Sequence, residues 1–159
     1  MTENISDNII IRPFKPEDLF IVSEIEQESF DVYGYPRFFF QQAFEVFGKL
    51  FRVAEVGGKI VGYVLGALQY NCPEAWLLSI AVLKSYRQKR IGLLLTEDLL
   101  KIFGSMGVKS VLLTVEPDNS GAQKLYEKFG FAEIDRIDNY FGHNEPRIIM
   151  KWIAPAIIT

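Results

Sequence analysis

A short polar stretch carries four cations within seven residues and joins two apolar segments of the chain. The cations are Lys84, Arg87, Lys89 and Arg90. The stretch follows the apolar run Trp76–Leu83 and leads directly into the helical periodicity of Ile91–Phe103. Because backbone amides and the positive end of the dipole meet at a helix start, this arrangement predicts a turn that binds pyrophosphate. A solvated connection whose charges only keep the chain soluble is the alternative.

A second stretch, residues 115–131, reads VEPDNSGAQKLYEKFGF. It predicts the end of a strand, a turn, a helix over Asn119–Phe129 and a glycine cap at Gly130. Tyr126 lies within this helix, where a lone tyrosine is expected to pack on a neighbouring sheet.

Together, the two stretches resemble the GNAT superfamily of N-acetyltransferases. The acetyl-CoA motif of that superfamily reads Gln/Arg-x-x-Gly-x-Gly/Ala at the helix start, followed downstream by Asn, Ala, a Tyr seven residues after the Asn, and Gly-Phe. The first part is filled here by Arg87, Ile91 and Gly92. The second part is filled at full spacing by Asn119, Ala122, Tyr126, Gly130 and Phe131. The resemblance extends to the order of elements, and it implies an acyltransferase that uses acetyl-CoA and releases CoA.

One position departs from the motif, because Arg90 stands where the phosphate-binding turn of the superfamily has its first glycine. If this position requires a positive φ, arginine costs about 1 kcal/mol or more of local strain. A shift in turn geometry, with the guanidinium itself helping to bind phosphate, is the alternative.

The resemblance implies that the cofactor lies where two parallel strands, here Trp76–Leu83 and Val108–Val115, splay apart to form a cleft. Backbone groups around Ile80 and Val82 would pair with the pantetheine arm. Tyr126 matches the residue that protonates the departing thiolate, a role suited to a phenol. The residues expected to bind the cofactor are Ile80, Ala81, Val82, Arg87, Gln88, Lys89, Arg90, Ile91, Gly92, Leu93, Asn119, Ala122 and Tyr126.

The sequence offers no obvious general base, although an amine acceptor must lose a proton before it attacks. In similar N-terminal acetyltransferases the base often lies at positions that match Trp76 and Thr114, and neither is a base here. Glu116 is the first candidate, since it should point to the same face as Thr114. A carboxylate that caps the following turn is the alternative. Ser79 could order a water from the opposite strand, and water-mediated deprotonation without a dedicated base is also open.

Two aromatic segments are expected to bind the acceptor. Residues 30–36 (FDVYGYP) lie where the superfamily varies its substrate loop, and residues 137–141 (IDNYF) resemble the aromatic-pair hairpin of RimI-like and arrest-defective-type N-terminal acetyltransferases. Such loops could clamp an extended peptide through tyrosine hydroxyls, or the aromatics could only seal the edge of the core. The predicted substrate-binding residues are Phe30, Asp31, Tyr35 and Tyr140.

The elements that must position these residues follow from periodicity and turn signals. Strands are predicted at 9–12, 51–55, 59–69, 76–83, 108–115, 134–141 and 147–152, and helices at 16–29, 38–47, 91–103 and 119–129. Gly57-Gly58 predicts a hairpin. This order predicts an α/β fold with a mixed central sheet of about seven strands and helices on both faces, in a single domain over residues 1–159.

Composition narrows the remaining choices. The 159 residues are 49% hydrophobic and 23% charged, as in globular proteins, and a net charge of -3 provides no field that would attract nucleic acid. With one cysteine and one histidine, a Cys/His metal site is implausible. The N-terminal residues lack a basic region followed by an apolar run, and no segment approaches ~18 uninterrupted apolar residues. We therefore expect a cytoplasmic protein without a membrane or nucleic-acid partner.

The resemblance favours transfer of acetyl to the α-amino group of protein or peptide N-termini, by a monomer or weak homodimer. Whether an auxiliary or ribosome-associated subunit takes part is left open. A small-amine (polyamine-like) N-acetyltransferase on the same fold is one alternative. A non-catalytic CoA-binding module is another, and the absence of family bases at Trp76 and Thr114 favours it.

Overall fold

The computed structural model describes residues 8–156. The first seven residues, on which the expectation of a cytoplasmic protein partly rests, lie outside this range. Within it, no helix has both the length and the apolar character needed to cross a bilayer. The same range contains no group of three or more His, Cys, Asp or Glu placed to hold a metal ion.

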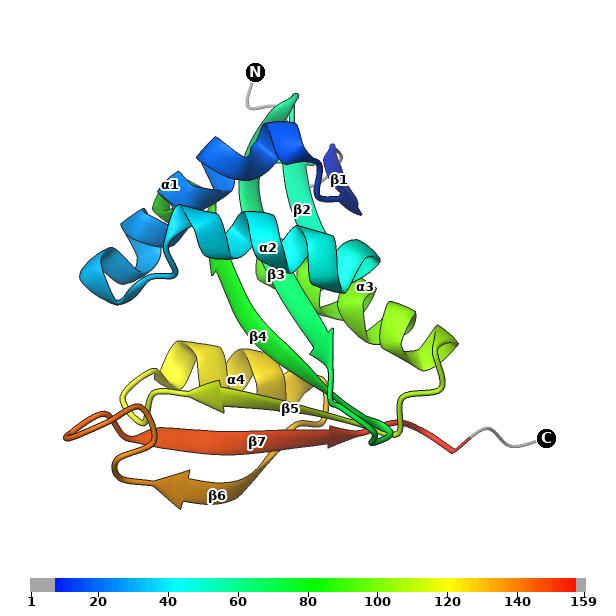
Figure 1. Ribbon diagram of the computed structural model, residues 1–159, viewed down its shortest axis with the longest axis vertical. Helices are drawn as coiled ribbons and strands as arrows, with labels where there is room; N and C mark the ends of the chain where they lie inside the picture. Colours follow the sequence, from blue (N-terminus) through cyan, green and yellow to red (C-terminus); the bar gives the residue numbers. More distant parts are fainter. Residues whose placement is uncertain (1–7, 157–159) are drawn as a thin grey trace. The chain divides into compact units, whose positions relative to one another are not determined.

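The order of elements agrees with the sequence prediction (Figure 1). The strands are β1 (Ile9–Pro13), β2 (Phe51–Val56), β3 (Lys59–Leu68), β4 (Glu74–Val82), β5 (Ser110–Val115), β6 (Ala132–Ile137) and β7 (Arg147–Ile153). The α-helices are α1 (Leu19–Phe30), α2 (Arg37–Phe47), α3 (Ile91–Ser105) and α4 (Ser120–Lys128). Single 3-10 turns occupy Pro16–Asp18, Asp31–Tyr33, Gly48–Leu50 and Lys84–Tyr86.

The strands form one mixed seven-stranded sheet in the order β1-β2-β3-β4-β5-β7-β6, which confirms the predicted fold class. The β2–β3 hairpin turns at Gly57-Gly58, where both glycines have positive φ. β4 and β5 run parallel and pair Glu74–Trp76 with Ser110–Leu112, so their ladder covers only the start of β4. β5–β7 and β6–β7 are antiparallel.

One predicted strand is wrong at its end. The strand expected over 134–141 stops at Ile137, and residues 138–141 form a turn. The Asn139 side chain accepts a hydrogen bond from the Asn144 backbone N–H (3.1 Å), and the Asn139 carbonyl accepts one from Gly142 (3.2 Å). These local bonds satisfy the backbone without a strand partner, which is why the aromatic segment bends.

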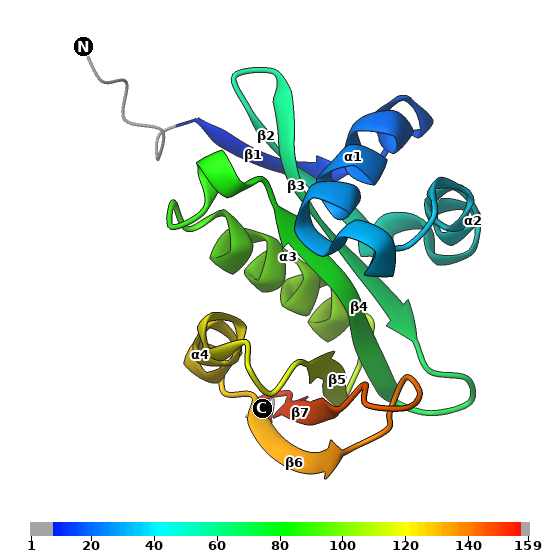
Figure 2. The same ribbon diagram turned by 90° about the vertical axis from the view of Figure 1, so that its left-hand side faces the viewer.

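The chain packs into two compact units. One comprises residues 8–66 together with Ser79–Ile102, and the other comprises Ala67–Leu78 and residues 103–156. In the first unit, α1 and α2 lie on one side of the strands and α3 on the other (Figure 2). The prediction of a single domain over residues 1–159 stays a prediction.

Aromatic rings fill much of the core of the first unit. Phe40, Phe51 and Tyr63 are each 0% exposed. The Phe40 ring meets Tyr63 edge-on with centroids 5.3 Å apart, and Phe14 stacks on Phe51 at 4.1 Å. Rings of this size bury large apolar areas, so this cluster is a main source of packing energy in the unit.

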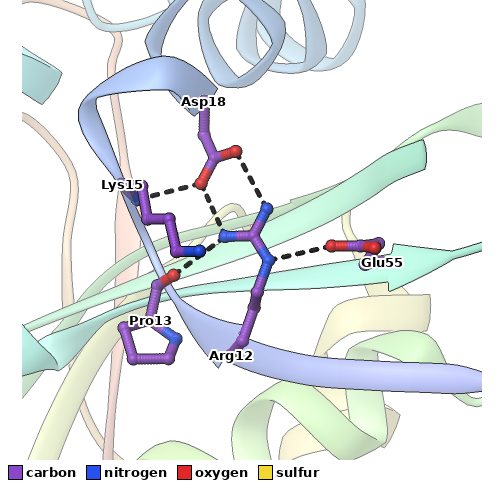
Figure 3. Close-up of polar contacts among 5 residues, drawn as sticks. All are labelled: Arg12, Pro13, Lys15, Asp18 and Glu55. Carbon is purple, nitrogen blue, oxygen red and sulfur yellow. Dashed lines mark hydrogen bonds and ion pairs between the residues drawn. The ribbon is translucent and has the colours of Figure 1, made fainter. Parts of the chain in front are cut away.

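A charged network joins β1, β2 and the start of α1 (Figure 3). The Arg12 guanidinium donates to both carboxylate oxygens of Asp18 (2.8 and 3.0 Å) and to Glu55 (2.8 Å). The Lys15 backbone N–H also donates to Asp18 (2.9 Å). Burial alone would raise the pKa of Asp18, but the hydrogen bonds from Arg12 and Lys15 outweigh it and hold that pKa below its ordinary value. The pair therefore stabilises the fold as an ion pair.

Replacing Asp18 by Asn should lower the free energy of unfolding by about 2 kcal/mol at pH 7, because Arg12 loses its charged partner. A carboxyl whose folded pKa is depressed stabilises the protein above its unfolded pKa of about 4, and this contribution disappears as pH falls through the folded pKa. Urea unfolding of both proteins between pH 7 and pH 3 should show that the wild type loses more stability below about pH 4. Parallel pH curves would contradict this.

Candidate active site

The basic turn between β4 and α3 has left-handed backbone geometry. Gln88 has φ 60° and Arg90 has φ 66°. Arg90 thus adopts the conformation that glycine would adopt most easily, so the turn keeps its geometry and arginine bears the strain. The alternative of a shifted turn at this residue is wrong.

Side-chain bonds connect this turn to α1 and to the end of β4. Arg87 donates through Nε to the Val82 carbonyl (3.0 Å) and through Nη2 to the Ser29 hydroxyl (3.4 Å). The Lys84 backbone N–H donates to the Glu28 carboxylate (3.3 Å). These contacts hold the polypeptide of the turn in one place ahead of α3.

The start of α3 provides the donors that an anion requires. Ile91 is 1% exposed and anchors the first turn, while the first backbone bond of the helix runs from Leu94 to the Arg90 carbonyl. The amides of residues 91–93 precede that bond, as at every helix N-terminus. With exposed Lys84 and Arg90 beside them, they form a donor set that suits a pyrophosphate. Gln88 is exposed, whereas Lys89, Gly92 and Leu93 are half-buried.

The last part of β4 presents alternate backbone groups to its two edges. Leu83 donates its N–H to Val61 on β3, and a Cβ built at Gly62 on β3 would lie 3.0 Å from the Ala81 carbonyl oxygen. Ala81 and Leu83 therefore face β3, and the backbone groups of Ile80 and Val82 face the opposite edge. An extended ligand arm that pairs with this strand would need backbone groups in this orientation. The Val82 carbonyl already accepts a hydrogen bond from Arg87.

In the second unit, Asn119 is the N-cap of α4. Its Oδ1 accepts a hydrogen bond from the Ala122 backbone N–H (3.0 Å), and Gln123 closes the preceding turn by donating to the Glu116 and Pro117 carbonyls (3.2 and 3.0 Å). The cap fixes where the helix begins and thus where its side chains point.

Tyr126 is 5% exposed, with its ring centroid 5.8 Å from that of Phe131. Burial raises the pKa of Tyr126, so the phenol keeps its proton at neutral and mildly alkaline pH. The ring packs as an ordinary core aromatic would, and the hydroxyl remains a hydrogen-bond donor. The geometry is thus compatible with both interpretations of this residue.

Glu116 lies at the surface of the protein, and its role as a base stays a prediction. Its side chain is 62% exposed and lies 3.6 Å from the Arg147 guanidinium. The N-cap of the following helix is Asn119. Thr114 is half-buried on β5 opposite Ile149, and Trp76 donates its indole N–H to the Gln69 side chain (2.9 Å).

Ser79 belongs to a hydrogen-bonded cluster that includes two residues the sequence reasoning missed, Glu26 and Tyr63. The Ser79 hydroxyl lies 2.7 Å from the Tyr63 hydroxyl, which in turn donates a hydrogen bond to Glu26. Glu26 is 2% exposed. Its position beside Val22 and Ile25 on the apolar face of α1 was the available signal, since a carboxylate at a core position of an amphipathic helix requires partners.

The predicted acceptor residues lie in both units. In the first, Asp31 and Tyr35 line a surface hollow of about 640 Å³ beside α1, and the Tyr35 ring stacks on Phe39 at 4.2 Å. Phe30, at the end of α1, is 39% exposed.

In the second unit, Tyr140 lies in the turn after β6, half-buried, with its ring edge-on to Phe141 at 4.7 Å. The Arg147 guanidinium lies 4.8 Å from the centroid of the Phe141 ring. The substrate roles of the residues in either unit stay predictions.

Comparison with known proteins adds to this geometry. A profile of the acetyltransferase (GNAT) family matches residues 16–131. An uncharacterized N-acetyltransferase of Methanocaldococcus jannaschii is 31% identical over 143 residues, covering 89% of this chain and 90% of that protein. An N-alpha-acetyltransferase of Sulfurisphaera tokodaii is 31% identical over 128 residues, covering 74% and 77%. The crystal structure of Ard1 from Thermoplasma volcanium is similar with a TM-score of 0.86 at 29% identity, covering 94% and 99%.

Replacing Arg90 by Gly should raise the free energy of unfolding by about 1 kcal/mol, because glycine adopts a positive φ without steric cost. The matched control is Arg90→Ala, which removes the charge but keeps a Cβ and should bring little gain. Urea unfolding of the three proteins measures both effects. Equal stabilisation by the two variants would show that charge repulsion, not backbone strain, is relieved.

Proposed function

Because the chain belongs to the acetyltransferase (GNAT) family, we propose that it transfers acetyl from acetyl-CoA to the α-amino group of protein or peptide N-termini. The chain is an acyltransferase, and acetyl-CoA is the acyl donor of its family. The choice of acceptor is supported chiefly by its 31% identity, over 74% of the chain, to a protein named N-alpha-acetyltransferase. The likeness to Ard1 supports the same choice.

In this proposal the basic turn and the start of α3 bind the pyrophosphate of the donor. The amides of Ile91 and Gly92 point out of the helix end, and Arg90 adds a guanidinium beside them. The outward backbone groups of Ile80 and Val82 pair with the pantetheine arm. When bound, acetyl-CoA supplies the activated carbonyl carbon that the amine attacks. Arg87 acts by fixing the turn to β4 and α1 rather than by reaching the ligand.

Tyr126 supplies the hydrogen-bond donor for the leaving sulfur. A buried phenol that holds its proton can donate a hydrogen bond to the developing thiolate, and it adds no negative charge of its own beside the sulfur. Asn119 contributes through the cap, because it sets the start of the helix that carries Tyr126.

The residues proposed to bind the acceptor peptide are Phe30, Asp31 and Tyr35 in the first unit and Tyr140 in the second. The proposal also keeps a cytoplasmic location and a monomer or weak homodimer. It allows for an auxiliary or ribosome-associated subunit.

Replacing Tyr126 by Phe should lower kcat about 100-fold and leave the KM for acetyl-CoA within about 2-fold, because only the hydroxyl is lost and the ring still packs. Steady-state CoA release with a peptide acceptor measures both constants. Tyr70→Phe is the matched control, since Tyr70 is 94% exposed and loses the same atom without effect. An unchanged kcat in Tyr126→Phe would remove this residue from the mechanism.

The acceptor itself is tested with a panel of short peptides that differ at their first two residues, assayed beside spermidine and other polyamines by mass spectrometry. We expect mass gains of one acetyl on peptides with a free α-amino group, and none on matched peptides blocked at that amine but carrying a free lysine. Faster turnover of polyamines would overturn the choice of acceptor. Binding of acetyl-CoA without turnover of any amine would overturn the enzymatic proposal.

A further inference from the structure

The buried carboxylate of Glu26 joins three separate segments of the first unit. One of its oxygens accepts the hydroxyl proton of Tyr63 on β3 in a hydrogen bond, and the other accepts the backbone N–H of Tyr35 in the loop after α1 (3.0 Å). Gly34 packs directly against this side chain, since a Cβ at that position would lie 3.0 Å from the Glu26 Cγ. Among residues 8–156, no cation forms an ion pair with Glu26. The titratable side chain bonded to it is Tyr63, whereas Tyr35 reaches it through the backbone N–H.

The hydrogen bonds of this cluster run in one direction. A phenol has a single proton, and Tyr63 donates it to Glu26, so the 2.7 Å contact with Ser79 must be donated by the Ser79 hydroxyl. Ser79 donates to Tyr63 and Tyr63 donates to Glu26. The Ser79 hydroxyl oxygen can then accept a proton from another group, such as a ligand.

Only the Ser79 end of this series of hydrogen bonds is open to a ligand. Glu26 and Tyr63 are 2% and 0% exposed, whereas Ser79 is half-buried on β4. Ser79 immediately precedes Ile80, one of the residues whose backbone faces away from β3. A proton can therefore enter at Ser79 and reach the interior without any of the buried groups meeting solvent.

We propose that Glu26 is the terminal proton acceptor of the reaction, reached through Ser79 and Tyr63, and that it also positions the acceptor loop through Tyr35. The inference deepens the proposed function and rests on it. In the transfer step, the amine N–H⁺ gives its proton to Ser79 Oγ, the Ser79 proton moves to Tyr63 Oη, and the Tyr63 proton moves to the Glu26 carboxylate. After the product leaves, the same series of hydrogen bonds returns one proton from Glu26 to solvent at Ser79.

Electrostatics favour this direction of transfer. Burial raises the pKa of Glu26, and the hydrogen bonds from Tyr63 and the Tyr35 N–H offset only part of that effect. Burial and the adjacent Glu26 carboxylate raise the pKa of Tyr63, so that the phenol relays protons without ionising. Glu26 acts through other residues, so it is a positioning residue, and Ser79 is the group that touches the amine.

The primary test is Ser79→Ala, which removes the open end and leaves the bonds among Glu26, Tyr63 and Tyr35 intact. With a peptide acceptor whose α-amino pKa is about 8, kcat should fall about 100-fold at pH 7. The loss should shrink to less than about 10-fold at pH 9.5, where most of the amine is already neutral. Ser79→Thr keeps a hydroxyl and should restore most of the activity. A loss that is the same at every pH, or no loss at all, would overturn the relay.

A second variant, Glu26→Gln, keeps the shape of the side chain but cannot accept a proton. It should show the same pH-dependent loss of kcat and leave the KM for acetyl-CoA unchanged. The KM for the peptide should rise, because the hydrogen bond that holds the Tyr35 loop is altered. Glu24→Gln, at an exposed position of the same helix, is the matched control and should behave as wild type. Wild-type kinetics in Glu26→Gln would overturn the proposal.

A readout independent of turnover comes from carboxyl carbon NMR of the free protein. The Glu26 signal, assigned by its loss in Glu26→Gln, should titrate above the ordinary glutamate pKa of about 4.3, and a midpoint at or below that ordinary value would overturn the relay. Failure of the wild type to acetylate any peptide would reject the proposed function instead. Peptide turnover by the wild type, together with a loss of kcat in the variants that does not depend on pH, would reject only the relay.

Discussion

Burial of one carboxylate organises the first unit. An ionised carboxyl group removed from water is costly unless hydrogen bonds replace its hydration. Glu26 obtains them from Tyr63 on β3 and from the backbone of the loop after α1, and Tyr63 in turn engages Ser79 on β4. The helix, the loop and two strands must therefore keep one arrangement. Among the described residues, no buried side-chain polar atom of the protein is left without a partner.

Two other charged groups of this unit differ in how their charges are matched. In the first, Arg12 pairs with both Asp18 and Glu55, and these ion pairs fix the start of α1. In the second, the turn before α3, the cations Lys84, Arg87, Lys89 and Arg90 gather, and backbone amides add to their field. The first group is paired within the unit, whereas the cations of the turn suit an anionic ligand. Such contrast is typical of a binding site built on a stable frame.

Several residues combine a structural and a chemical role, and this explains why their interpretation was ambiguous. Asn119 caps α4, and the same cap fixes the orientation of Tyr126. Arg87 has a motif position that suggests a ligand contact, yet its guanidinium bonds Val82 and Ser29. Arg90 bears backbone strain at the position where the superfamily has glycine. In each case the contacts of the side chain, and not its residue type, indicate whether it holds the fold together or is available to bind or react.

Features that depend on neighbours in the chain could be predicted from the sequence alone. The order of elements, the Gly57-Gly58 hairpin, the Asn119 helix start and the family motif all follow from spacing and local backbone preference. The Glu26 cluster could not be predicted, since its partners lie 37 residues apart for Glu26 and Tyr63 and 16 for Tyr63 and Ser79. Which side chains meet over such separations depends on how helix and sheet pack, and burial then decides which carboxylate is removed from water. The fold and the acyl donor of the family thus follow from local patterns in the sequence, whereas the contacts of Glu26 with Tyr63 and the loop after α1 arise only when helix and sheet pack together.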